Sequence, residues 1–237
     1  MLESLRNKRI LVVVAHPDDE DLGLGGTIHK LVHEYNCVIR TIILGEGITS
    51  RSDERDAAKW NKELKQHRRN IQSSIKAVGY DSVGIYDFPD NRFDDVNVLD
   101  LVKVIEKEKQ EFKPSVIFTH HGGDTNVDHQ LTFQAVITGC RPMSHEMVKI
   151  ILTFETPSST EWQAFNHPMY FTPNMYVGLK KKNVDAKIKA MESYEFEKRP
   201  FPHPRSPEAL TILAQKRGVE VGENYAEAFM VIRSINY

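Results

Sequence analysis

The sequence predicts an α/β protein in which helices cover both faces of a mostly parallel sheet. Three observations lead to this prediction. Short β-branched runs, of which 10–14 is the clearest, are typical of buried parallel strands. These runs alternate with longer segments of helical pattern. Two clusters of His and Asp directly follow such runs, and ligands bind at the carboxyl ends of strands in sheets of this kind. We therefore expect a Rossmann-like three-layer sandwich with its active site at that edge.

The first part of the chain consists of four strand–helix units. The strands are expected at 9–15, 37–44, 83–87 and 115–119, and the helices that follow them at 24–34, 53–78, 97–112 and 127–139. Gly25, Gly26 and Thr27 open the first helix. Gly79 ends the second, because glycine readily adopts the left-handed conformation found after helix C-termini.

The pattern becomes less regular after residue 145. A strand-like run at 148–154 leads into a stretch rich in Pro, Ser and Thr. Two further helices are expected at 183–195 and 206–217. The prolines between and beside them indicate an ordered loop or lid; they are Pro200, Pro202, Pro204 and Pro207.

Length and composition are those of an ordinary globular domain. The chain has 237 residues, of which 40% are hydrophobic and 27% charged. No linker, repeat or low-complexity segment interrupts it. We expect residues 1–237 to form a single domain, in which 1–145 hold the core sheet and the metal site and 146–237 shape the substrate pocket.

Charge and hydropathy argue against several classes of partner. The net charge of −2 indicates neither nucleic acid nor an anionic membrane. No apolar run approaches the ~20 residues of a membrane span. The first predicted strand starts too early to leave room for a signal peptide. Cys37 and Cys140 lack metal-ligand spacing and the pattern of a disulfide framework. A cytoplasmic protein is the expectation.

The segment Ala15-His16-Pro17-Asp18-Asp19-Glu20 is the most informative in the chain. Proline ends the first strand, so His16, Asp18 and Asp19 lie on a loop at its carboxyl end. A capped turn would explain one aspartate, but not this concentration of imidazole and carboxylate groups. These groups suit a metal site with a spare base beside it.

A second cluster follows the strand at 115–119, from Thr119 to His129, and contains three histidines and two aspartates. If both strands are central and parallel, the two loops meet at one edge of the sheet. The first loop would then supply two metal ligands and the second loop one. Three protein ligands leave one coordination position open for water, which is the arrangement of a catalytic zinc site. His129 would otherwise be a surface histidine of a helix, and Asp128 beside it favours ligation.

The remaining histidines are assigned less directly. His120 or His121 is expected to lie around the ligands or to face the substrate. His203, in a proline-rich segment, belongs either to a loop or to the wall of the active site. The others read as ordinary helix, loop or surface residues; they are His29, His33, His67, His145 and His167.

At these residues the chain resembles the PIG-L/LmbE family of metal-dependent N-acetylsugar deacetylases. The segment at 15–20 matches that family's first motif in full, and Asp128-His129 resembles the end of its second. Weaker similarities lie at Arg68, at Pro89-Asp90-Asn91 and at 225–229, so the resemblance spans nearly the whole chain.

The resemblance implies a role for each matching residue. His16, Asp19 and His129 become metal ligands, and Asp18 becomes the general base. Arg68 and Asp90 fall where the family contacts the sugar, and His120 and His203 are further candidates for the substrate pocket. The metal is expected to be Zn²⁺, although the ligand set also suits Fe²⁺ or another divalent ion. The substrate is expected to be a small-molecule amino-sugar conjugate, and the assembly a homo-oligomer, either a trimer or a hexamer.

One position departs from the family pattern, since Asn126 stands where members often carry a histidine. An amide can donate a hydrogen bond but cannot deliver a proton. Zinc and Asp18 would activate water, and Asn126 or His121 would stabilise the oxyanion. Asp18 would return its proton to the leaving amine, and Asp128 would orient a ligand imidazole.

Two other functions fit the same residues. An amidase could act on a larger acyl group or a thiol-conjugate amide, and a non-catalytic Rossmann-like module could hold a structural metal. A structural metal site would have four protein ligands. It would also leave the carboxylate of Asp18 without a function. A dinucleotide site is disfavoured because Gly23-Leu24-Gly25-Gly26 lacks the G-x-G-x-x-G spacing.

Overall fold

A computed structural model describes residues 2–235, and within them lies one seven-stranded sheet with the order β3-β2-β1-β4-β5-β7-β6. The strands are β1 (Arg9–Val14), β2 (Val38–Gly45), β3 (Ser82–Phe88), β4 (Val116–His120), β5 (Ile150–Phe154), β6 (Met175–Leu179) and β7 (Tyr225–Ser234). The α-helices are α1 (Asp19–Tyr35), α2 (Asn61–Val78), α3 (Val98–Phe112), α4 (Val127–Gly139), α5 (Lys181–Met191) and α6 (Pro207–Val219). Short 3₁₀ turns lie at η1 (Leu2–Leu5), η2 (Thr49–Arg51), η3 (Phe93–Asp95) and η4 (Thr160–Trp162).

The sheet is parallel from β3 through β5 and antiparallel at its other edge. β1 pairs in parallel with β2 and β4, and β4 pairs in parallel with β5. β7 runs antiparallel to both β5 and β6. The predicted three-layer α/β fold with a mostly parallel sheet is therefore confirmed.

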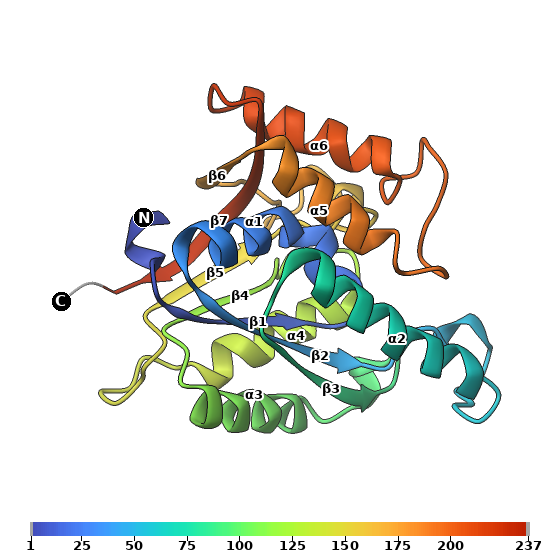
Figure 1. The fold of residues 1–237 in the computed structure, drawn as a ribbon. Coiled ribbons are helices and arrows are strands. Elements are labelled where there is room, and N and C mark those ends of the chain that lie inside the picture. Colours follow the sequence, from blue (N-terminus) through green and yellow to red (C-terminus); the bar gives the residue numbers. More distant parts are fainter. Residues whose placement is uncertain (1, 236–237) are drawn as a thin grey trace.

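Helices cover both faces of this sheet (Figure 1). α1, α2, α5 and α6 lie on one face, and α3 and α4 lie on the other. Alternate residues of β1 enter the two cores: Val12 packs with the first set of helices, and Val13 packs with the second. Burial on both faces explains why the β1 sequence is continuously apolar rather than alternating.

The first helix begins earlier than expected, at Asp19 rather than at residue 24, and it is kinked at Leu24. The expected helix corresponds to the part after the kink. There Glu227 accepts hydrogen bonds from the backbone N–H groups of Gly26 and Thr27 at 3.1 and 2.7 Å. This side chain replaces the backbone partners that the kink removes, so the helix continues through an irregular turn.

Other boundaries differ at irregular segments. α2 begins at Asn61 instead of residue 53, and 53–60 form bends and turns. α5 ends at Met191 instead of residue 195. The sequence did not predict β6 or β7. In β7 the sequence Ala226-Glu227-Ala228 lacks a β-branched pattern, because Glu227 is a buried partner of Lys187 rather than a solvent-facing residue.

The topology brings two loops to one site. Because β1 and β4 are adjacent and parallel, the segments that follow them lie at the same edge of the sheet. α1 starts from the first loop and α4 from the second, so both helix N-termini also lie there. Among the described residues, no helix is both long and apolar enough to cross a membrane.

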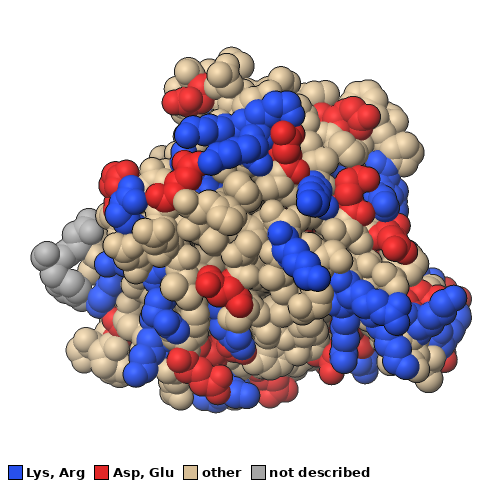
Figure 2. All heavy atoms as spheres, viewed as in Figure 1, with Lys and Arg blue, Asp and Glu red and all other residues tan. Residues whose placement is uncertain are grey.

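Charged side chains of both signs are interspersed over the face shown in Figure 2, with Lys and Arg gathered over α2. The sequence of α2 explains this patch, because its exposed side carries several basic residues; they are Lys62, Lys65, Arg68, Arg69 and Lys76.

Candidate active site

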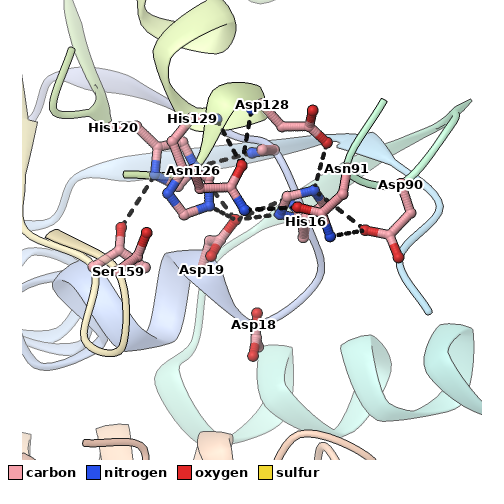
Figure 3. A network of polar contacts seen from close by, with 12 residues as sticks. His16, Asp18, Asp19, Asp90, Asn91, His120, Asn126, Asp128, His129 and Ser159 are labelled. Atoms are coloured by element: carbon pink, nitrogen blue, oxygen red, sulfur yellow. Dashed lines mark hydrogen bonds and ion pairs between the residues drawn. The ribbon is translucent and has the colours of Figure 1, made fainter. Parts of the chain in front are cut away.

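Two imidazoles and one carboxylate converge at the edge of the sheet where β1 and β4 end (Figure 3). His16 Nδ1 and His129 Nε2 each lie 3.4 Å from Asp19 Oδ2. The donor atoms of these three residues all lie within 4.8 Å of one another. Two nitrogens and one carboxylate oxygen at this spacing are a donor set that suits Zn²⁺ and related divalent ions.

A carboxylate faces the other nitrogen of each of these histidines. His16 Nε2 lies 2.9 Å from Asp128 Oδ2, and His129 Nδ1 lies 3.2 Å from Asp124 Oδ1. The N–H of Phe93 holds Asp128, and the hydroxyl of Thr160 holds Asp124. Such carboxylates fix the tautomer of a ligand histidine and make its free nitrogen a better donor. The arrangement leaves the nitrogens that face Asp19 available to a metal ion.

Asp124 was not assigned a role from the sequence, although it belongs to the second cluster. It is fully buried and bonded by the hydroxyls of Ser159 and Thr160 as well as facing His129. Burial raises the pKa of Asp124, but His129 and the two hydroxyls outweigh it and lower the pKa to about 2. The carboxylate is therefore ionised at neutral pH and can orient His129.

The charges of the site also change the pKa values of His16, Asp19 and His129. Burial lowers the pKa of His129, but the carboxylates of Asp19 and Asp124 outweigh it and raise the pKa to about 9. The pKa of His16 is likewise raised, because Asp128 and Asp19 outweigh its burial. Conversely, burial raises the pKa of Asp19, but the positive charge of His129 and the contact with His120 outweigh it and bring the pKa well below its usual range.

Metal binding is therefore expected to release protons and to strengthen as the pH rises. His129 with a pKa of about 9 is protonated at pH 7, and a metal ion can bind only its deprotonated form. The apparent affinity for Zn²⁺ should increase from pH 6 to about pH 9. Above that pH, His129 is already deprotonated and no longer makes the affinity depend on pH. Calorimetric titration in buffers of different ionisation enthalpy measures the protons released. An affinity that is constant over this range would contradict the assignment.

The same groups make the stability of the metal-free protein depend on pH. The pKa of about 9 for His129 lies above the unfolded value of ~6.5. Its protonation thus contributes stability that is complete below pH ~6.5 and is lost as the pH rises through about 9.

His120 lies behind His129 and is not among the residues that line the cavity. It is completely buried, and its ring stacks on that of His129 with centroids 3.8 Å apart. The N–H of Ala15 donates to its Nε2 at 3.0 Å, and its Nδ1 lies 3.1 Å from Thr156 Oγ1. Burial and the nearby charge of His129 lower the pKa of His120 to about 4. The structure corrects the expectation of a substrate contact: His120 is a neutral residue that supports His129.

His121 is also withdrawn from the site. Its Nε2 lies 2.5 Å from the carbonyl oxygen of Met169, and its ring packs against Phe171. It is 3% exposed and does not line the cavity at the metal-ligand group. This position offers no donor to an oxyanion, so the structure does not place His121 in the role expected from the sequence.

A cavity opens beside the three converging residues. Both halves of the chain line it, with mainly polar side chains; the lining residues are His16, Pro17, Asp18, Gly47, Ile48, Ser50, Arg51, His67, Asp90, Asn91, Asn126, His129, Ser158, Ser159, Glu197 and Arg205. In Figure 3, Asp18 lies apart from the metal-ligand group, between it and the ribbon of α2.

Asp18 is paired with an arginine that the sequence did not single out. Arg205 Nη1 lies 2.9 Å from Asp18 Oδ2 and 2.8 Å from Glu197 Oε2. Arg205 Nε also donates to Ser158 Oγ at 2.7 Å. Burial raises the pKa of Asp18 well above its usual range, and the charge of Arg205 opposes this rise. Arg205 thus favours the ionised form of the carboxylate and fixes one of its oxygens.

His203 lies two residues before Arg205 and does not line the cavity. Its Nδ1 accepts a hydrogen bond from the N–H of Arg205 at 3.2 Å, and its ring lies against Trp162. The proline-rich segment therefore reaches the site through Arg205, and His203 orders the turn that presents it.

Asp90 and Asn126 lie at the cavity, whereas Arg68 does not. Asp90 Oδ1 is 3.4 Å from His16 Nε2, and its Oδ2 accepts hydrogen bonds from Ser50. Asn126 Oδ1 caps α4 by accepting from the N–H groups of Asp128 and His129. The Arg68 side chain is 64% exposed and pairs with Asp87, so the structure corrects its assignment to the substrate site.

Comparisons with known proteins agree with this fold. A family model described as PIG-L: GlcNAc-PI de-N-acetylase matches residues 11–140. The uncharacterized deacetylase YaiS of Escherichia coli (strain K12) is 25% identical over 201 residues, which cover 82% of this chain and 95% of YaiS.

Two solved structures share the fold. The N,N'-diacetylchitobiose deacetylase from Pyrococcus horikoshii has a TM-score of 0.71 and 17% identity, with 95% of this chain and 84% of that chain covered. GalB, the 4-carboxy-2-hydroxymuconate hydratase from Pseudomonas putida KT2440, has a TM-score of 0.73 and 20% identity, with 97% and 98% covered. Because a deacetylase and a hydratase share this fold, the reaction has to be argued from the residues of the site.

Proposed function

The chain belongs to the PIG-L family, and on that premise we propose that it is a metal-dependent hydrolase that removes the acetyl group from an N-acetylhexosamine-type substrate. The observation that carries this proposal is the convergence of His16 Nδ1, His129 Nε2 and Asp19 Oδ2 at a cavity that Asp18 also lines. Three protein ligands leave a coordination position open, and a base stands beside it.

A divalent ion held by these residues would lower the pKa of water bound to it and polarise the acetyl carbonyl. Asp18 Oδ2 is held by Arg205, whereas its Oδ1 makes no hydrogen bond within residues 2–235. We assign to this oxygen the removal of the proton from the attacking water. The same carboxyl group then delivers a proton to the nitrogen of the leaving amine.

Asn126 completes the site mainly by fixing the backbone. Its Oδ1 is occupied by the first turn of α4, and its Nδ2 donates to Asn91 Oδ1 at 2.8 Å. The second hydrogen of the Nδ2 amide group remains available to an oxyanion. We propose that Asn126 binds the oxyanion through this hydrogen. Asp128 is proposed to orient His16 and does not touch the substrate.

The second part of the chain is proposed to complete the substrate pocket. Ser158, Ser159, Glu197 and Arg205 all line the cavity and all come from 146–237. Zn²⁺ is the proposed metal, with Fe²⁺ as an alternative of the same ligand chemistry. A cytoplasmic location and a trimeric or hexameric assembly stay predictions.

Replacing Asn126 by alanine is expected to destabilise the protein by about 1 kcal/mol, because α4 loses its N-cap. Asn126→Ser is the matched control, since serine caps helices and lacks the amide N–H. If Asn126 also donates to the oxyanion, both variants should lose ~10²-fold or more in kcat. Urea unfolding and steady-state kinetics separate the two roles. Unchanged stability of Asn126→Ala would contradict the capping role.

The proposed function is tested by the release of acetate from a panel of N-acetylhexosaminides, with Zn²⁺ and after its removal by a chelator. Metal-dependent release supports the proposal. An amidase for larger groups would instead prefer longer acyl chains in a parallel panel. A protein that binds zinc but releases no acyl group would be a binding module, and the proposal would fail.

A further inference from the structure

His67, on α2, is a buried imidazole at the cavity with no polar partner. It is 3% exposed, and it lines the same cavity as His16 and Asp18. Within the described part of the chain, neither Nδ1 nor Nε2 of His67 makes a hydrogen bond. Buried polar groups are nearly always hydrogen-bonded, so two unpartnered nitrogens at the wall of a cavity indicate a ligand that supplies the partners.

Apolar contacts alone fix the position of this ring. It stacks on Phe196 with centroids 5.5 Å apart and planes inclined by 20°, and it lies 6.5 Å from the ring of Tyr194. Gly47 also lies near the ring, since a Cβ added there would be 3.8 Å from His67 Cε1 and 3.0 Å from Pro17 Cδ. The ring is therefore held in one orientation while both nitrogens stay unused.

The charges around His67 are already balanced by protein groups. Arg51 Nη2 lies 2.5 Å from Glu197 Oε1, and Arg205 Nη1 lies between Glu197 and Asp18. A phosphate group would have to compete with these carboxylates for both arginines. Burial lowers the pKa of His67, so the imidazole is neutral at pH 7 and offers one donor and one acceptor. Donor and acceptor together match hydroxyl groups rather than an anion.

We infer that His67 is a specificity-determining residue, whose two ring nitrogens bind hydroxyl groups of an uncharged sugar, so that the site prefers neutral N-acetylhexosaminides to their phosphate esters. This inference rests on the proposed function, because it assigns a contact within the same cavity. The sequence alone predicts that His67 is an ordinary helix, loop or surface residue, and the family resemblance favours its neighbour Arg68. Consecutive helical residues point about 100° apart, and the structure places the earlier one at the cavity.

The test compares His67→Phe with the wild type, and it uses Arg68→Ala as the matched control on the same helix. Phenylalanine preserves the stack on Phe196 and removes both nitrogens. The substrates are methyl N-acetylglucosaminide, its 3-, 4- and 6-deoxy analogues, and its 6-phosphate, each with the zinc-loaded enzyme. Zinc content is measured for every variant.

His67→Phe should lose roughly tenfold or more in kcat/KM for the parent sugar, mainly through KM, at unchanged zinc content. Each deoxy analogue that lacks a hydroxyl bound by His67 should show part of this loss with the wild type but no further loss with His67→Phe, because that hydrogen bond is already absent from the variant. The 6-phosphate should be at least ~10-fold poorer than the parent for the wild type. Equal losses for every analogue in both proteins, or a preferred 6-phosphate, would overturn the inference.

Binding is also followed without turnover, by the imidazole NMR signals of histidine-labelled wild type, with the His67 signal identified by its absence from His67→Phe. If the parent sugar shifts this signal but no acetate is released, the inference stands and the proposed function fails. Acetate release with an unmoved His67 signal overturns the inference alone. If the His67 signal does not move and no acetate is released, both the inference and the proposed function are overturned. If His67→Phe does not fold, the signal is assigned with His67→Asn, and the deoxy series with the wild type decides.

Discussion

His129→Ala is expected to lose both the bound metal and the deacetylase activity while the sheet stays folded. His129 Nε2 is one of three donor atoms that converge on one point, and its removal leaves only His16 and Asp19. Loss of a group that merely orients a ligand weakens metal binding by 10–100-fold, so loss of the ligand itself should exceed ~100-fold. Metal analysis of the purified variant, with circular dichroism to confirm folding, measures the effect.

Asp124→Asn is the matched control for this variant. It leaves all three ligands in place and removes the charge that faces His129 Nδ1 at 3.2 Å. Its zinc affinity should fall by roughly 10–100-fold, between the wild type and His129→Ala. Full zinc occupancy of His129→Ala would refute the ligand assignment.

Asp18→Asn is expected to keep the metal and to lose at least ~10²-fold in kcat, the usual effect of removing a general base. The substitution is conservative in other respects. Asp18 has φ 106, a region that asparagine tolerates better than most residues, and an amide oxygen can still accept the hydrogen bond of Arg205. The loss therefore reports on proton transfer rather than on the loop.

Asp19→Asn should show the opposite pattern, because Asp19 Oδ2 is the atom shared by both ligand histidines. Its zinc content should fall first, and activity should fall with it. If Asp18→Asn loses zinc and Asp19→Asn retains it, the roles of the two aspartates are reversed.

The central strands and the first motif could be predicted from the sequence because local signals determine them. β1 is buried on both faces, and this burial requires the continuous apolar run from which the strand is predicted. The histidine and aspartate cluster that follows it is unusual enough to indicate chemistry by itself. The position of β4 beside β1 then brings His129 to the same edge.

The residues that were not predicted reach the site through long-range packing. Arg205 arrives from a proline-rich segment 187 positions after Asp18, and no local pattern reports that contact. His67 and Arg68 cannot be distinguished until the orientation of α2 against Phe196 is known. The sequence does not predict β7 for the same reason, since its buried Glu227 is explained by Lys187 and by the kink of α1.

Anomalous diffraction from a zinc-soaked crystal, recorded at the zinc absorption edge, would show whether His16, Asp19 and His129 hold a metal ion. We expect one strong peak about 2.0–2.2 Å from His16 Nδ1, His129 Nε2 and Asp19 Oδ2, at the cavity that Asp18 also lines. The same region offers a competing group, since His16 Nε2 also lies close to Asp90 and Asp128. A peak at that second group, or none at the first, would contradict the ligand assignment and the reaction built on it.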